Sequence, residues 1–560
     1  MLERRHFLQL ALALGAGGPL FANPLRSFAQ QGLNQADLLA FEPLGQVTLL
    51  HLTDLHAQLV PVWFREPSIN VGVGEVAGLP PHITGRAFLE HYGIEPGSAL
   101  AYATASTDFT ALARSYGRVG GLDRIATLVR AIRGERPGNT LLLDGGDTWQ
   151  GSYTALETRG ADMVRAMNAL GVDAMTAHWE FTYGDERVNE LIEELDFPLL
   201  AANVFDTEWD EPVFESTAYF ERGGVKVAVI GQAFPYTPIA NPRYKIPTWS
   251  FGVREEAMAA AVEAARAEGA GLVVVLSHNG FDVDRKMAAR VPGIDVILTG
   301  HTHDALPAVV EVGKTLLVAS GSHGKFLSRV DLDVGADGVK DYRYRLIPVF
   351  ADAIAPDAEM AAVVAAIRAP HLEQLGRELA RSASLLYRRG NLNGTFDDLI
   401  CQSLMERRDA EIALSPGFRW GASVLPGEAI TAEDVYNQTA ITYPEAYRSE
   451  MSGAQLKAIL EDVADNLFNP DPYYQQGGDM VRVGGIGFDL RVAAARGRRI
   501  ENLRRLSDGE PLDAGRNYVV TGWASVNPGV EGPPVYDLVR DYLAERDEVT
   551  VTPNEAVKLV

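Results

Sequence analysis

Between about residues 45 and 350, short apolar runs alternate with longer amphipathic segments. The runs include QVTLLHLTD, TLLLDGGD, VKVAVIGQ and GLVVVLSHNG, and the segments between them include LDRIATLVRAIR and REEAMAAAVEAARAEG. Strands that alternate with helices build a largely parallel sheet, whose buried strands are almost continuously apolar. The pattern therefore predicts an α/β domain over 45–350.

Several of these predicted strands end in aspartate or histidine. In HLTDLHAQL and in LTGHTHDA two such residues are spaced i and i+2, so an extended chain points both the same way. Sites in α/β domains form at the carboxyl ends of strands, so we expect all of these side chains to converge. Seven N and O ligands without cysteine exceed the needs of one metal ion and suit two ions that share a carboxylate. The seven residues are Asp54, His56, Asp147, His178, His278, His301 and His303.

The remaining sequence indicates an export signal and a second domain. Paired Arg4 and Arg5, a short apolar stretch and Ser27-Phe28-Ala29 resemble a twin-arginine export signal over 1–29, which predicts a periplasmic protein. No other segment is long and apolar enough to be a membrane anchor. At 560 residues the chain exceeds one core, and we expect a linker helix over 351–383 and a C-terminal domain over 384–560.

The chain is acidic and has a single cysteine. A net charge of −24 argues against nucleic acid as a partner, because phosphate backbones are bound by basic surfaces. Cys401 has no intrachain partner, so no disulfide framework is expected, and its apolar setting in FDDLICQSL predicts a buried helix residue.

The metal-ligand motifs resemble those of a known superfamily. D-x-H, G-D, S-H-N-G and G-H-T-H in this order resemble the calcineurin-like dinuclear metallophosphoesterases, and among them the exported 5'-nucleotidases. This resemblance implies a four-layer αββα sandwich over 45–350 with a dinuclear metal site, followed by a smaller α/β domain of the 5'-nucleotidase C-terminal type that binds substrate. It implies one metal on Asp54, His56, Asp147 and His303, and the other on Asp147, His178, His278 and His301, with Asp147 as the bridge.

One block departs from that superfamily. AHWEFTYG stands where the family has Gly-Asn-His-Glu-Phe-Asp, so His178 replaces an asparagine ligand, Trp179 the catalytic histidine and Thr182 its aspartate partner. Without the imidazolium, the departure of an alkoxide should slow by on the order of 10²-fold or more. Thr182 fits this loss, because an aspartate with no imidazole beside it would be an unpaired charge. The block therefore predicts a leaving group that needs little help, such as a thiolate or persulfide.

The same departure, with the long insertion over 57–116, resembles the SoxB-type thiosulfohydrolases of sulfur-oxidising bacteria. The resemblance implies a hydrolase that releases sulfate from a cysteine-bound thiosulfonate during thiosulfate oxidation. The cysteine would lie on the C-terminal arm of a SoxYZ-like sulfur-carrier protein. It also implies two Mn²⁺ ions, although Asp/His ligand sets accept Zn²⁺, Fe²⁺ or Co²⁺ as well.

Three further residues are candidates for the catalytic site. Arg419 in SPGFRWGA and Arg65 in VWFREPS are each either a clamp for the sulfonate or a surface ion-pair residue. Trp179 either lines the site or packs in the core. Two other functions stay open. A periplasmic 5'-nucleotidase or phosphodiesterase should keep histidine and aspartate at positions 179 and 182, and a non-catalytic scaffold should have lost metal ligands.

Overall fold

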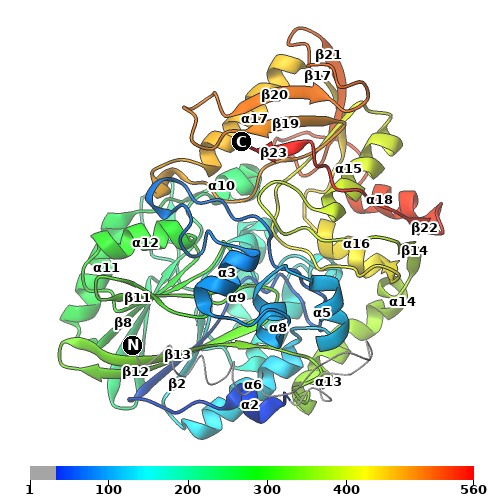
Figure 1. The fold of residues 1–560 in the computed structure, drawn as a ribbon. Coiled ribbons are helices and arrows are strands. Elements are labelled where there is room, and N and C mark those ends of the chain that lie inside the picture. The colour runs from blue at the N-terminus through cyan, green and yellow to red at the C-terminus, as the bar shows by residue number, and fades with distance from the viewer. Residues whose placement is uncertain (1–32) are drawn as a thin grey trace.

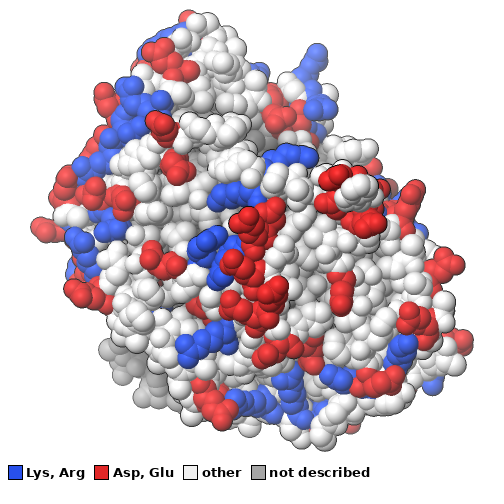
Figure 2. All heavy atoms as spheres, turned by 180° about the vertical axis from the view of Figure 1, so that it is seen from behind, with Lys and Arg blue, Asp and Glu red and all other residues white. Residues whose placement is uncertain are grey.

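The computed structural model describes residues 33–560, and the predicted export signal over 1–29 lies outside this range. Figure 1 shows a larger part, coloured blue to green, and a smaller part, coloured yellow to red, packed against one end of it. Within residues 33–560, no helix has both the length and the apolar character to cross a membrane. Figure 2 shows acidic and basic side chains interspersed over the rear face, with no continuous basic area among the described residues there.

The larger part contains two sheets. The first has the strand order β13-β12-β1-β2-β3, in which β1, β2 and β3 run parallel and β12 pairs antiparallel with β1. Its strands are β1 (Val47–Leu52), β2 (Thr140–Asp144), β3 (Ala174–Met175), β12 (Phe326–Gly335) and β13 (Gly338–Pro348). The second has the order β10-β11-β9-β8-β6-β5, with β6, β8, β9 and β11 parallel. Its strands are β5 (Thr217–Arg222), β6 (Val225–Gln232), β8 (Leu272–Ser277), β9 (Val296–Thr299), β10 (Val310–Val312) and β11 (Thr315–Ala319).

Alternate residues of the strands belong to different cores, because successive side chains point to opposite faces of a sheet. Leu49 of β1 packs between the two sheets with Val274 of β8, whereas Leu50 packs on the outer face of the first sheet and Val273 on the outer face of the second. The outer helices are α6 (Leu122–Glu135), α8 (Ala161–Leu170) and α13 (Ala358–Arg368) on the first sheet, with α11 (Glu255–Ala267) and α12 (Phe281–Arg290) on the second. The predicted four-layer αββα sandwich is confirmed.

The smaller part combines short sheets with four helices. Its strands form the orders β16-β14-β22, β17-β21-β15-β18 and β20-β19-β23. They are β14 (Glu378–Ser382), β15 (Ile412–Ser415), β16 (Ala429–Thr431), β17 (Tyr447–Ser452), β18 (Arg482–Gly484), β19 (Ile486–Leu490), β20 (Ile500–Arg505), β21 (Asn517–Gly522), β22 (Glu548–Val549) and β23 (Val557–Leu559). The helices are α15 (Thr395–Arg408), α16 (Ala432–Thr439), α17 (Gly453–Leu467) and α18 (Val535–Ala544). Cys401 is buried in α15, as predicted.

The predicted linker helix over 351–383 is wrong in extent. Only α13 and the four-residue α14 (Leu372–Leu375) are α-helical there, and β14 already belongs to the C-terminal sheets. Pro370 lacks an N–H and disrupts the helix ladder, and Gly376 follows α14 directly. The exact division of the chain into domains stays a prediction.

The insertion over 57–116 is folded. It contains α3 (Gly85–Tyr92), α4 (Ala99–Thr104) and α5 (Phe109–Tyr116), which contribute side chains to the cores on both outer faces. A buried ion pair fastens its first residues, since Lys325 Nζ donates to Glu66 Oε1 at 2.9 Å and to Phe64 O at 3.0 Å.

We expect Glu66→Gln to lower the free energy of unfolding by about 3–5 kcal/mol, because it leaves the buried Lys325 ammonium without a counter-charge. Denaturant titration of the mature protein would measure the change. The double variant Glu66→Gln/Lys325→Met should recover most of the loss, since it removes both charges. A single variant as stable as wild type would contradict the prediction.

Candidate metal centre

Two clusters of buried aspartate and histidine meet at one carboxylate. In each cluster, one ligand atom from every residue lies within 4.8 Å of the others. The first cluster is Asp147, His178, His278 and His301, and the second is Asp54, His56, Asp147 and His303. Asp147 belongs to both, which is the position of a bridging ligand. The structure thus brings together all seven residues predicted from the strand ends, in the two predicted groups.

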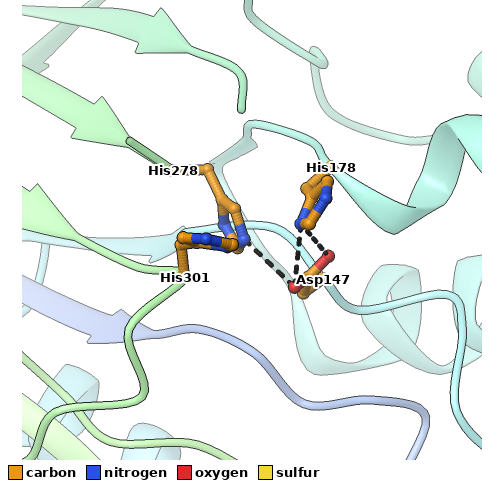
Figure 3. Close-up of side chains that lie close together, drawn as sticks. All are labelled: Asp147, His178, His278 and His301. Carbon is orange, nitrogen blue, oxygen red and sulfur yellow. Dashed lines mark hydrogen bonds and ion pairs between the residues drawn. The ribbon is translucent and has the colours of Figure 1, made fainter. Parts of the chain in front are cut away.

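The ligand atoms face one another at short range. His278 Nε2 lies 3.1 Å from Asp147 Oδ2, and His178 Nδ1 lies 3.2 Å from the same carboxylate (Figure 3). On the other side, His303 Nε2 lies 3.1 Å from both Asp54 Oδ1 and His56 Nε2. Imidazole nitrogens and carboxylate oxygens that converge in this way form a donor set that fits divalent metal ions.

The loops that carry these residues have an unusual backbone. Asp54, His56, Asp147, His301 and His303 all have φ between +46° and +72°, in the left-handed region that non-glycine residues rarely adopt. Such conformations cost of order 1–3 kcal/mol each and cluster at functional sites. The strand ends therefore turn sharply where each ligand must point inwards.

A second set of groups orients the ligands. His278 Nδ1 donates to Gly145 O at 2.6 Å, which leaves the Nε2 lone pair of the neutral ring free for a metal. The carboxylate of Asp54 accepts from the Thr53 hydroxyl at 2.7 Å and from the backbone N–H of His301 at 3.1 Å. These contacts hold one donor atom of each ring or carboxylate towards the centre.

Glu180, which was not among the predicted site residues, connects two of the ligand loops. Its fully buried carboxylate accepts from the backbone N–H of His178 at 2.7 Å and of Thr148 at 2.6 Å. It thereby holds the loop after β3 against the loop after β2. The family pattern also has a glutamate at this place in the block, and this match could have identified Glu180 as a residue of the site.

Burial and charge control the protonation of the metal-free site. Burial lowers the pKa of His301 and of His303 well below the usual value, so both rings are neutral and ready to bind a cation. Burial alone would raise the pKa of Asp147, but His178 and His278 lower it well below its usual range. Burial opposes the charge on His278, yet Asp147 and Asp54 raise its pKa to about 10.

We therefore expect metal loading to release protons. At pH 7.5 the metal-free His278 is protonated because its pKa is about 10, and a cation must displace that proton, so metal affinity should rise by about tenfold per pH unit for each proton displaced. Calorimetric titration of Mn²⁺ in buffers of different ionisation enthalpy would measure the release. His371→Gln, outside both clusters, should leave it unchanged. Equal heats in all buffers would contradict the prediction.

The side chain of Trp179 forms part of an aromatic wall. Its ring centroid lies 5.0 Å from that of His178, 5.3 Å from Phe418 and 5.2 Å from Trp420, and only 5% of its surface is exposed. Its backbone N–H donates to Asp147 Oδ1 at 2.8 Å. Trp179 thus both packs in the C-terminal core and lies directly against the metal centre. The Thr182 hydroxyl shares a hydrogen bond of 2.7 Å with the hydroxyl of Thr442.

The predicted clamp arginines have other partners. Arg419 donates to His301 O at 3.1 Å and to Gly478 O at 2.6 Å, so it lies beside the ligand loop. The Arg65 guanidinium lies 4.1 Å above the Tyr387 ring. A third, unpredicted arginine, Arg389, is buried and donates to His303 O at 3.2 Å. A clamping role for Arg419 or Arg65 stays a prediction.

Solved structures resemble this chain over nearly its whole length. The structure of the sulfate thiohydrolase SoxB of Thermus thermophilus, in complex with glycerol, has a TM-score of 0.90 and 40% identity, covering 93% of this chain and 98% of that one. A 5'-nucleotidase precursor, also of Thermus thermophilus, has a TM-score of 0.72 at 22% identity, covering 92% and 99% of the two chains. The latter shows the shared fold alone.

Sequence comparisons also relate this chain to the 5'-nucleotidases. Residues 376–537 match the family described as 5'-nucleotidase, C-terminal domain, which confirms the predicted type of the C-terminal region. The protein UshA of Yersinia enterocolitica is 25% identical over 489 residues, or 76% of this chain and 84% of that protein. The 5'-nucleotidase of Rattus norvegicus is 32% identical over 195 residues, or 34% of this chain. The chain spans about a third (33%) of the length of that relative.

Proposed function

This chain belongs to the SoxB-type branch of the metal-dependent hydrolases in the 5'-nucleotidase superfamily, and we propose that it releases sulfate from a cysteine-bound thiosulfonate on a sulfur-carrier protein. One observation carries the proposal. Trp179 occupies the place of the catalytic histidine of nucleotidases, directly against a complete set of metal ligands. A site that keeps its metal ligands but has no acid at this position suits a leaving group of low basicity.

The residues of the site would divide the work as follows. Two divalent metal ions, when bound, supply Lewis-acid polarisation of the sulfonate oxygens and a water molecule of lowered pKa. Asp147 spans both clusters, and the backbone N–H of Trp179 fixes its carboxylate. The indole of Trp179, packed on Phe418 and Trp420, excludes water from that side. The carrier persulfide leaves as an anion, without a proton donor from position 179.

The metal, the partner and the location belong to the same proposal. We propose two Mn²⁺ ions, on the chemistry of an all-N/O ligand set without cysteine, which Zn²⁺, Fe²⁺ and Co²⁺ also suit. The partner is a SoxYZ-like carrier with its cysteine on a C-terminal arm. Export by the twin-arginine route would place the enzyme in the periplasm with its metals already loaded.

Arg419 is proposed to contact the sulfonate. Its guanidinium borders the ligand loop through His301 O, but it also has a carboxylate partner, Asp479, at 3.4 Å. We expect Arg419→Ala to lower kcat/KM about tenfold or more with no loss of metal, because a charge-assisted hydrogen bond to substrate is removed. Turnover and metal content would be measured together. Unchanged turnover would refute the clamp.

A paired assay tests the proposed function. The mature protein is loaded with manganese and checked for about two metals per chain. One substrate is AMP, with phosphate release followed, and the other is a carrier protein bearing the cysteine thiosulfonate, with sulfate release followed. We expect sulfate without phosphate. Phosphate without sulfate would establish the 5'-nucleotidase alternative, and neither product from a fully loaded enzyme would favour a non-catalytic role.

A further inference from the structure

A cavity of about 80 Å³ lies beside the metal centre, where three distant segments meet. Its walls come from the insertion at residues 67–73, from the loop and first turn of α12 at 279–283, and from the C-terminal segment 475–479. Of the seven metal-ligand candidates, only His301 lines it. Arg419 lines it as well, so the cavity opens beside the clusters and shares a wall with the proposed sulfonate contact.

One wall of this cavity is the N-terminus of a helix. Gly280 is the N-cap of the ten-residue α12, and residues 280–283 all line the cavity. The N–H of Phe281 has only a long hydrogen bond, of 3.4 Å, to Thr302 Oγ1, and Asp282 lies in the same first turn. The first N–H groups of a helix have no partner within the helix and carry a partial positive charge. Together they favour an anion at this end of the cavity.

A buried cation that forms no ion pair lines the same cavity. Arg389 is 5% exposed. Within the described part of the chain its only hydrogen bond is to His303 O, and its Nε has no partner. Among residues 33–560, no carboxylate oxygen lies within 4.0 Å of its guanidinium nitrogens, since it forms no ion pair. A buried guanidinium left unpaired is costly, so its surroundings call for an anion.

The nearby carboxylates, those of Glu66, Asp479 and Asp304, favour the charge on Arg389, but none forms an ion pair with it. The carboxylates of the cavity wall have closer partners of their own. The pairs are Asp479 with Arg482 at 3.0 Å, Asp282 with His82 at 2.9 Å, and Asp304 with the amide of Asn70 at 3.0 Å. Asp479 also accepts from Arg419. The guanidinium of Arg389 and the N-terminus of α12 are therefore the groups of the cavity wall that can bind an anion.

We propose that this cavity is a binding site for a tetrahedral oxyanion, and that it takes up the sulfate released at the metal centre. A guanidinium and the backbone N–H groups of a helix N-terminus are the donors that bind such anions elsewhere. The volume accommodates one small oxyanion or several water molecules. The assignment to product sulfate rests on the proposed function, whereas the oxyanion site itself does not.

Two variants test the site without removing a metal ligand. Arg389→Gln removes the cation, and Val71→Phe fills the cavity while keeping every charge. The matched controls are Arg86→Gln and Ala77→Phe, which make the same changes at exposed positions of the insertion. Sulfate binding to the manganese-loaded mature protein is measured by calorimetry at low ionic strength, with metal content determined in each sample.

We expect sulfate affinity to fall by about tenfold or more in Arg389→Gln and Val71→Phe, and to stay at the wild-type value in both controls. Wild-type affinity in Val71→Phe with full metal content would place the sulfate on the metal ions and overturn the proposal. Absence of measurable sulfate binding to the wild-type protein would also overturn it. This equilibrium test gives its answer even if the protein proves to hydrolyse another substrate.

The role in product release has a kinetic test of its own. If the cavity takes up product sulfate, Val71→Phe should keep the wild-type rate of the first turnover but slow the steady state, so that a burst of sulfate appears on acid quench. Added sulfate should inhibit the wild type and Ala77→Phe more strongly than Val71→Phe. A slower first turnover in Val71→Phe would mean that the cavity serves the substrate, and would overturn the product assignment.

Discussion

Asp147→Asn is expected to lower sulfate release on the order of 10³-fold and to reduce the metal content from two ions to fewer than one per chain. Asp147 is the one residue that contributes to both clusters, and its carboxylate has His278 Nε2 at 3.1 Å and His178 Nδ1 at 3.2 Å. An amide keeps the shape but removes the negative charge that two cations require. Both sites should therefore weaken together.

Metal analysis after dialysis, followed by the sulfate assay, would measure both effects. Asp162→Asn is the matched control, because Asp162 is also buried but hydrogen-bonds to Thr158 and to the backbone N–H of Met163 rather than to a metal ligand. His301→Gln should remove mainly one ion, since His301 belongs to a single cluster. If Asp147→Asn kept two ions and lost only activity, the carboxylate would not be a bridge.

The metal centre was predictable because its signal is local in the sequence. Each ligand follows an apolar run, so one rule, that α/β sites lie at the carboxyl ends of strands, collects all of them. The left-handed backbone at Asp54 and Asp147 was not predictable, since neither residue type requires it. Tertiary contacts impose it, as when the backbone N–H of Asp54 donates to Gly146 O of the neighbouring strand loop.

Contacts between distant segments that no strand-end pattern marks could not be predicted. Arg65 stacks on Tyr387, which lies more than three hundred residues away, and nothing near VWFREPS indicates that partner. Arg389 became visible as a buried cation only when its surroundings were known. The linker helix failed for a different reason, since its apolar periodicity continued across Pro370 although the helix ladder does not.

The second large effect concerns the chemistry of position 179. We expect Trp179→His/Thr182→Asp to raise phosphate release from AMP by about 10²-fold over wild type and to lower sulfate release from the carrier. An imidazolium beside the metals can assist an alkoxide, which the indole does not. The indole also packs on Phe418 and Trp420, so its loss loosens the wall that excludes water.

The groups around Thr182 determine how much AMP hydrolysis the double variant gains. Lys245 Nζ donates to Thr442 and to Thr182 O, so a new carboxylate at position 182 would have an ammonium close by as well as the imidazole. Trp179→His alone is therefore the matched control, and it should gain less AMP hydrolysis than the double variant, because its imidazole lacks an orienting partner. Both variants should still bind two metal ions, because the hydrogen bond to Asp147 comes from the backbone N–H of residue 179 and does not depend on its side chain. If the double variant lost sulfate release without gaining any AMP hydrolysis, leaving-group assistance would not be what separates the two chemistries.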